Sequence, residues 1–358
     1  MARYTPFTAE QSRIFVDTEQ SREALDHAKR LARSHQGGMH WKTIKGRQYL
    51  YRTTDRLGNA ASLGVRSEQT ERTYSEFTNG KRLAGERLRS LRSHVAERAR
   101  FCVAARINRV PRLVADILQF FDEAGLLGKN LMVVGTNALY AYEAAGACLI
   151  GSDLLATADV DLLWDARTRL QVARLDDEIR GPGFLAMLQR VDKTFVPLQE
   201  NGFRAINASG FFVDLIKPTP SPALRREISR MSPDDPIQAS EIDSLRWIVS
   251  SEKFSHAVID EDGFPLMISV PDPRAFAAHK LWLSGQQNRE PVRKRRDALQ
   301  ALVVASILRN RLPRYLFSME SLKSFPLPVA RAVLPALREG NSSDDAGTAP
   351  ETGFAGPR

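Results

Sequence analysis

Residues 156–165, ATADVDLLWD, restrict the fold of this chain more than any other segment does. They place two aspartates, Asp159 and Asp161, one residue apart inside an apolar run that predicts a buried strand. Side chains alternate along a strand, so both carboxylates face the same side, about 6.5–7 Å apart. Two ionised carboxylates this close repel each other unless a cation lies between them or one takes up a proton. The segment therefore predicts a strand whose polar side binds a metal ion.

An apolar strand, a glycine turn and a helix precede this pair in the sequence VVGTNALYAYEAAG. Gly135 lacks a β-carbon and lets the backbone come close to a ligand. Thr136 and Asn137 add a hydroxyl, an amide and free backbone N–H groups at a helix N-terminus, which suits a phosphate. The alternative is an ordinary helix N-cap, which Thr or Asn also provides.

A third aspartate lies further along, in FRAINASGFFVDLIKP. This segment predicts two strands that meet near Ser209-Gly210, with Asp214 inside the second. If that strand runs beside the first, three carboxylates converge. Mg²⁺ is the expected cation, because it is hard and commonly shared between carboxylates and substrate phosphates. Two such ions would activate an attacking oxygen and neutralise a pyrophosphate leaving group.

The rest of the chain is mainly helical in pattern. Residues 40–65 are the exception, because turn signals there flank short runs rich in tyrosine and predict two or three short strands. The predicted helices cover residues 7–36, residues 68–100 with an interruption near Asn79-Gly80, residues 109–124, residues 167–191 around Gly181-Pro182-Gly183, and two segments after Pro273.

Positive charge is concentrated at the start of the chain. Residues 1–112 hold 23 Lys and Arg against 11 Asp and Glu, a balance of +12, whereas the whole chain carries +9. This excess favours a polyanionic partner such as RNA, and the basic and aromatic residues of the predicted hairpin would contact it. Two alternatives remain open: a solvated helix face rich in arginine, and tyrosines that pack against neighbouring helices.

Several classes of protein are excluded by composition. No apolar run approaches the length of a bilayer span, and the N-terminus lacks the layout of a signal peptide. We therefore expect a cytoplasmic protein that does not act at a membrane. The only cysteines are Cys102 and Cys148, so neither a disulfide framework nor a cysteine-ligated zinc site is expected.

The order strand, Gly-Thr turn, helix, Asp-x-Asp strand and later Asp resembles the DNA polymerase β-like nucleotidyltransferase superfamily. The fuller pattern resembles a bacterial nucleotidyltransferase-like family related to the AbiEii-type toxin nucleotidyltransferases. The segments that carry this resemblance span most of residues 40–305: HWKTIKGRQYLYR, LGVRSEQTE, VVGTNALYAYEAAG, ATADVDLLWD, PDPRAFAAHKLWLS and KRRDALQA.

The resemblance implies an α/β (α+β) fold class, with a small mixed-sheet nucleotidyltransferase core between helical N-terminal and C-terminal modules. The expected boundaries are a basic helical module with a short β-hairpin over 1–127, the core over 128–220, a mainly helical module over 221–338, and a disordered tail over 339–358.

It also implies catalytic roles and a metal. Asp159, Asp161 and Asp214 would coordinate Mg²⁺ or Mn²⁺, and Asp214 would also assist deprotonation of the acceptor hydroxyl. Gly135 and Thr136 would hold the triphosphate of the nucleotide.

The remaining nucleotide-binding residues expected from the resemblance are Asn137, Thr157, Lys280, Lys294 and Asp297. Lys280 would neutralise phosphate as a point charge, whereas its neighbour His279 is expected to pack within its helix. Two departures from the family pattern concern nucleotide contact. The turn is Gly-Thr-Asn rather than Gly-Gly-Ser. Related sequences often carry Arg-x-Ser/Thr before Asp-x-Asp, whereas this chain has Leu155-Ala156-Thr157, which keeps the hydroxyl but lacks the arginine.

The expected function is Mg²⁺-dependent transfer of an NMP from an NTP such as ATP to a hydroxyl of RNA, tRNA or protein. The toxin resemblance adds a role in defence and an antitoxin or other partner protein. Two alternatives remain open: a glycosyltransferase that uses Asp-x-Asp to bind a nucleotide-sugar, and a non-catalytic nucleic-acid-binding protein with a transferase-like core.

Overall fold

A computed structural model describes residues 3–53, 58–166, 183–220 and 229–339. Within these ranges the chain forms two compact units. The first, called here the helical-hairpin unit, comprises the described parts of 9–108 together with 259–265. The second, called the aspartate unit, comprises 3–8 and the described parts of 109–258 and 266–339.

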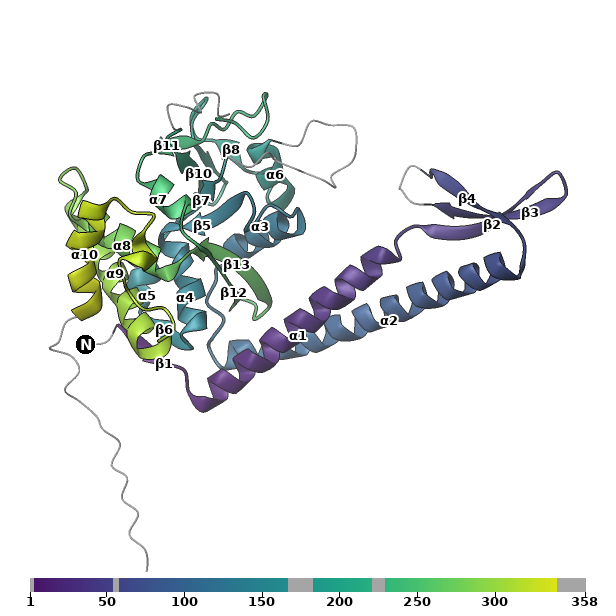
Figure 1. The fold of residues 1–358 in the computed structure, drawn as a ribbon, viewed down its shortest axis with the longest axis horizontal. Coiled ribbons are helices and arrows are strands. Elements are labelled where there is room, and N and C mark those ends of the chain that lie inside the picture. Colours follow the sequence, from purple (N-terminus) through teal and green to yellow (C-terminus); the bar gives the residue numbers. More distant parts are fainter. Residues whose placement is uncertain (1–2, 54–57, 167–182, 221–228, 340–358) are drawn as a thin grey trace, which may run out of the picture. The chain divides into compact units, whose positions relative to one another are not determined.

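The helical-hairpin unit is built on two long helices that run side by side in opposite directions, α1 (Ala9–Ser34) and α2 (Glu68–Ala104) (Figure 1). Small and apolar side chains are buried where they pack, and the hydroxyl of Thr18 lies 3.3 Å from the Cys102 sulfur. Between the helices the chain forms an antiparallel sheet of β2 (Gly38–Ile44), β3 (Arg47–Thr53) and β4 (Ala60–Val65). The strands predicted over residues 40–65 are thus confirmed as three.

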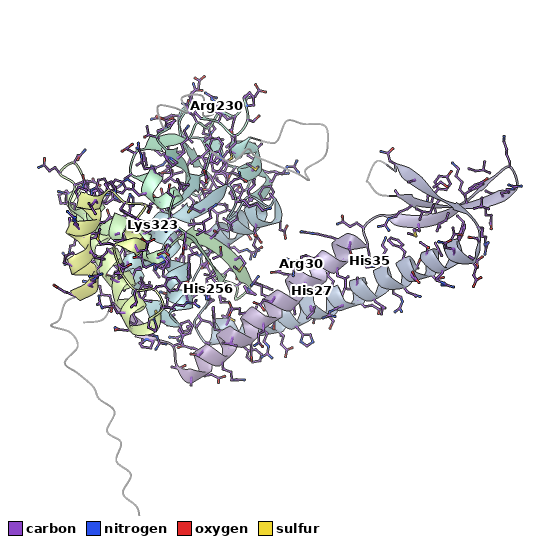
Figure 2. The ribbon with its side chains drawn as sticks, viewed as in Figure 1. His27, Arg30, His35, Arg230, His256 and Lys323 are labelled. Atoms are coloured by element: carbon purple, nitrogen blue, oxygen red, sulfur yellow. The ribbon has the colours of Figure 1, made fainter. Side chains whose placement is uncertain are left out.

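The predicted interruption of the second helix near Asn79-Gly80 is wrong, because α2 continues through it. A β-carbon at Gly80 would lie 2.5 Å from Nε2 of His35, the residue that follows α1 (Figure 2). The glycine therefore makes room for the histidine ring instead of ending the helix. A glycine costs a helix only about 1 kcal/mol relative to alanine, and the capping box of Ser67 and Thr70 supports the start of α2.

The aspartate unit contains a mixed sheet with the strand order β5-β7-β10-β9-β8. Strand β9 pairs with residues 212–214 of β10, and β11 pairs with residues 216–218 of β10. β7 and β10 are parallel, whereas β5–β7, β10–β9 and β9–β8 are antiparallel. The strands predicted around the Asp-x-Asp pair and on either side of Ser209-Gly210 are confirmed. The strands of this sheet are β5 (Leu131–Val134), β7 (Asp159–Trp164), β8 (Val196–Pro197), β9 (Arg204–Ile206), β10 (Phe212–Pro218) and β11 (Ser240–Ile242).

Helices pack around this sheet, and the apolar side chains buried with them form the core of the unit. The helix predicted over 109–124 is α3 (Arg112–Glu123), and its Phe121 stacks on Phe184 of α6 (Phe184–Val191) with ring centroids 6.0 Å apart. Of the helix predicted over 167–191, residues 167–182 lie outside the described residues. The Gly-Thr turn is η1 (Gly135–Ala138), which leads into α4 (Leu139–Ala145). The two helices expected after Pro273 are α8 (Pro273–Ser284) and α9 (Pro291–Arg311).

Other elements of this unit were not predicted from the sequence. They include a strand pair β1–β6, a pair β12–β13 and a last helix, and their bounds are β1 (Tyr4–Pro6), β6 (Cys148–Ile150), α5 (Ser152–Leu155), α7 (Leu245–Val249), β12 (Lys253–Ile259), β13 (Pro265–Pro271), η3 (Glu320–Leu322) and α10 (Leu327–Glu339).

The predicted fold class is confirmed: the chain is mixed α/β, with small mixed sheets and helices at both ends. The described parts of the predicted core and C-terminal module belong to one compact unit, so the module boundaries stay predictions. The tail from residue 340 lies outside the described residues. None of the helices in the described ranges has the length and hydropathy that a bilayer crossing needs.

A buried ion pair ties α4 to β6 and to the segment before α3. The Arg109 guanidinium donates to both carboxylate oxygens of Glu143, at 3.2 and 3.3 Å, and the backbone N–H of Ile150 donates at 2.6 Å. Burial raises the pKa of Glu143 to about 7, while Arg109 and the Ile150 N–H oppose that rise. The carboxylate thus depends on these partners for its charge.

We predict that Glu143→Ala lowers the free energy of unfolding by about 2–4 kcal/mol, because it leaves the Ile150 N–H without its partner and the half-buried Arg109 guanidinium with only the Ile150 backbone oxygen. Urea denaturation followed by tryptophan fluorescence measures the loss. Glu320→Ala is the control, since its exposed pair with Lys323 should contribute less than about 1 kcal/mol. Equal losses in the two variants would contradict the assignment.

Candidate active site

Strands β7 and β10 bring the three predicted aspartates to adjacent positions. They run parallel, and the register places Asp214 directly beside Asp161 and Phe212 beside Asp159. Asp159 and Asp161 are partly buried, and Asp214 is buried. The convergence expected from the sequence therefore holds for the backbone positions of all three.

The cluster raises the proton affinity of its central member. The pKa of Asp161 rises to about 7, first because the side chain is buried and then because Asp159 and Asp214 carry like charge. Lys280 and Arg204 act in the opposite direction. A carboxyl group in this setting gains from any further cation that comes close to it.

Arg204 pairs directly with one of the three aspartates, Asp214. It lies on β9 opposite Asp214, and its Nε and Nη2 donate to the two carboxylate oxygens at 2.6 and 2.5 Å. Asp214, and to a smaller extent Asp159 and Asp161, raise the pKa of the Arg204 guanidinium. The guanidinium also lies over the Phe212 ring, 4.8 Å from its centroid. Both oxygens of Asp214 are therefore already bound to a cation.

The turn before α4 lies against the same carboxylates. Gly135 has a φ of 68°, and a β-carbon there would collide with the Asp161 carboxylate. Asn137 is buried and donates from Nδ2 to the backbone oxygen of Asp159 at 2.7 Å. The hydroxyl of Thr157 donates to the Asp159 carboxylate. The turn thus holds the backbone of the Asp-x-Asp strand, and Thr157 holds the Asp159 side chain.

Helices α8 and α9 add a second group of charges. Lys280 is buried and donates from Nζ to Asp297 at 2.7 Å, while Arg289 donates from Nε to the other oxygen of Asp297 at 2.9 Å. Burial lowers the pKa of Lys280, whereas Asp297 and Asp161 oppose that change. Lys280 is therefore within electrostatic reach of the aspartates while its ammonium is held by Asp297.

Helix α9 also contacts the glycine turn directly. Arg296 donates from Nη2 to the Thr136 hydroxyl at 2.7 Å and from Nη1 to the backbone oxygen of Ala156 at 3.1 Å. Gln300 donates to the same hydroxyl at 3.3 Å and to the backbone oxygen of Leu154 at 2.8 Å. These bonds join α9 to the glycine turn and to the segment that precedes the Asp-x-Asp strand.

The donor set fits a hard divalent cation in part. Asp159 and Asp161 offer carboxylate oxygens from one face of β7, and two protein carboxylates completed by phosphate oxygens and water suit Mg²⁺. Among the residues that the structure describes, no three His, Cys, Asp or Glu side chains are close enough together to hold one ion. Asp214 would join such a site only after release from Arg204. The three-carboxylate metal site stays a prediction.

Comparison with known proteins adds the family. A family model described as Nucleotidyltransferase matches residues 112–323, more than half of the chain. The chain belongs to this nucleotidyltransferase family. The match runs from α3 to just after η3 and includes every site residue that the sequence predicted. No match to the chain was found among curated proteins or among solved structures.

Most residues predicted for this nucleotidyltransferase site are close to one another, although their roles stay predictions. Gly135, Asn137 and Thr157 contact the Asp-x-Asp strand, Thr136 contacts α9, and Lys280 pairs with Asp297. Lys294 lies on α9, but the contacts from this part of α9 run through its neighbours Arg296 and Asp297.

The sequence analysis missed Arg204, Arg289, Arg296 and Gln300. A signal for Arg204 was present, since a hairpin centred on Ser209 places residue 204 opposite residue 214.

We predict that Gly135→Ala destabilises the protein more than Gly125→Ala does. Both glycines have nearly the same φ, 68° and 71°, but Gly125 has nothing within 4 Å of an added β-carbon. A left-handed residue costs roughly 1–2 kcal/mol in either variant, and only Gly135→Ala must also displace the Asp161 carboxylate. Urea denaturation compares them, and equal losses would contradict the close approach.

A second prediction concerns His279, which is packed between Trp247 and Trp282 and hydrogen-bonded to the Ser244 hydroxyl at 3.0 Å. Burial, and then the charge of Lys280, lowers the pKa of His279 to about 3 from 6.5. The unfolded chain takes up this proton below about pH 6.5, whereas the folded chain does not. Stability is therefore lost as the pH falls from about 6.5, by up to about 1.4 kcal/mol per pH unit.

Denaturation at pH 7, 6 and 5 should show that His279→Gln loses this part of the pH slope. The exposed His27→Gln should keep it. A His279→Gln variant with the same slope as the unchanged protein would show that the imidazole titrates normally.

Proposed function

We propose that the chain transfers a nucleoside monophosphate from an NTP to an acceptor hydroxyl, using a divalent cation bound by the Asp-x-Asp strand. The observation that carries this proposal is the parallel register of β7 and β10, which sets Asp214 beside Asp161 of the Asp-x-Asp pair. Membership in a nucleotidyltransferase family supports the reaction class. The polymerase β-like character and the dependence on metal are parts of the proposal.

Asp159 and Asp161 would hold Mg²⁺, or Mn²⁺ in its place, which would supply positive charge against the triphosphate and the pyrophosphate leaving group. The backbone of Gly135 and the side chains of Asn137 and Thr157 keep the strand and its carboxylates in position. Lys280 would add positive charge near the phosphates. Catalysis would rest on positioning and charge neutralisation.

In this proposal the Arg204–Asp214 pair supplies a guanidinium that binds phosphate and a carboxylate that accepts a proton. When a triphosphate arrives, the guanidinium would move to phosphate oxygens, since it binds phosphate and carboxylate in the same bidentate geometry. The freed Asp214 carboxylate would then accept the proton of the acceptor hydroxyl. The oxygen of the acceptor hydroxyl forms the new bond to the α-phosphorus. The bond from the α-phosphorus to the oxygen that bridges it to the β-phosphorus breaks, and pyrophosphate leaves.

The test is incubation of the purified protein with each α-³²P-labelled NTP, Mg²⁺ and bacterial RNA or lysate, beside Asp159→Asn/Asp161→Asn. Label should enter a macromolecule only with the unchanged protein, and digestion with ribonuclease or protease then gives the acceptor class. The same mixture with a UDP-sugar tests sugar transfer. A folded protein that transfers no label from any NTP would overturn the proposal.

We also predict that Arg204→Gln raises the affinity for Mn²⁺ by at least about tenfold, because it removes positive charge beside Asp159 and Asp161 and releases the Asp214 carboxylate. Electron paramagnetic resonance of free Mn²⁺ measures binding without any enzymatic step. Asp161→Asn should weaken binding in both backgrounds. Unchanged affinity in Arg204→Gln would show that the guanidinium does not compete with a metal ion.

A toxin role, and with it an antitoxin partner, stays a prediction from the resemblance.

A further inference from the structure

The small sheet of the helical-hairpin unit has one face that packs on α2. On this face Trp41 lies against Tyr74 with ring centroids 5.9 Å apart, and Leu50 is fully buried. The guanidinium of Arg52 lies over the Phe77 ring, 4.6 Å from its centroid. These contacts anchor the sheet to the helix through one of its two faces.

The opposite face combines aromatic rings with positive charge. Register places His40 opposite Tyr51 and Lys42 opposite Tyr49, and all four side chains point away from the face that carries Leu50. His40 stacks on Tyr51 with centroids 6.0 Å apart and planes inclined by 19°, and Lys42 Nζ lies 5.7 Å from the centre of the same ring. His40 and Lys42 are exposed, and the tyrosines are half-buried.

Positive charge predominates in this region, because the sequence from 38 to 66 holds six Lys or Arg residues and one Asp. The described strands and turns over 38–53 and 60–66 contain five Lys or Arg residues and no Asp or Glu. Their net charge is positive although the helices beside them mix both signs. A polyanion would gain favourable contacts with Lys42, Lys45 and Arg47, whereas Arg66 is paired with Glu71 of α2 and Arg52 lies on the inner face of the sheet.

We propose that this outer face, defined by His40, Lys42, Arg47, Tyr49 and Tyr51, binds single-stranded nucleic acid. Exposed bases would stack on the tyrosine and histidine rings, and phosphates would contact Lys42 and Arg47. Stacking accepts every base, so binding tolerates many sequences, while a paired duplex hides the faces of its bases. That the bound strand is the acceptor of the transfer reaction rests on the proposed function, but its binding does not.

The experiment is fluorescence anisotropy of the full chain with labelled 12-nucleotide oligo-U and oligo-dT, without NTP, over a range of salt concentrations. Tyr49→Ala/Tyr51→Ala should weaken binding at least about tenfold, since each stacked base contributes between about fivefold and about 150-fold. Tyr49→Phe/Tyr51→Phe should bind within about threefold of the unchanged protein, because it keeps the rings and the packing. Lys42→Gln should lower the salt dependence by about 0.7 in logarithmic slope.

Matched controls lie on the helices of the same unit. Phe101→Ala removes an exposed ring from α2, and Arg30→Ala removes an exposed charge from α1 (Figure 2). Both should bind the oligonucleotides like the unchanged protein. The RNA and DNA arms decide between the two kinds of strand.

Failure of both oligonucleotides to bind, or equal binding by Tyr49→Ala/Tyr51→Ala, would overturn the proposal and leave the face to a protein partner. Equal weakening by Phe101→Ala would overturn it too. Asp159→Asn/Asp161→Asn should bind normally. Tyrosine-dependent binding by a protein that transfers no label would refute the proposed function and retain this surface.

Discussion

Repulsion among three neighbouring carboxylates is the constraint on which the aspartate unit depends. The parallel pairing of β7 with β10 sets Asp161 between Asp159 and Asp214, and burial adds to the cost of their charge. Such a cluster is stable only when positive charge surrounds it. The structure supplies that charge from β9 through Arg204 and from α8 through Lys280.

This balance explains why segments far apart in the sequence belong to one unit. Asp297 holds both Lys280 and Arg289, and the same helix α9 sends Arg296 back to Thr136 in the glycine turn. The C-terminal helices are therefore part of the candidate site. Because both oxygens of Asp214 accept hydrogen bonds from Arg204, the site has one arrangement with its own cation and, in our proposal, another with nucleotide and metal.

Local patterns in the sequence predicted the parts of the site that lie on single strands and turns. Alternation placed Asp159 and Asp161 on one face, and the Ser209-Gly210 turn placed Asp214 in a strand of its own. The pairing of β7 with β10 is tertiary, so the sequence could state it only as a condition. The position of Arg204 opposite Asp214 could have been predicted from the hairpin register alone.

Other features could not be predicted because they depend on contacts between distant segments. Arg296 contacts Thr136 across 160 residues of sequence. The low helix propensity of Gly80 predicted a break in the helix. In the structure the helix continues, and a glycine is needed there because the His35 ring lies against it. In both cases packing decides what propensity and composition leave open.

The most direct test of the central claim is a crystal structure with Mn²⁺ and a non-hydrolysable NTP analogue, with the anomalous signal of manganese recorded. We expect a manganese peak against Asp159 and Asp161, triphosphate oxygens beside Gly135 and Lys280, and an Arg204 guanidinium moved from Asp214 to phosphate. Nucleotide bound elsewhere, or Arg204 still paired with Asp214 and no manganese at the Asp-x-Asp strand, would contradict it.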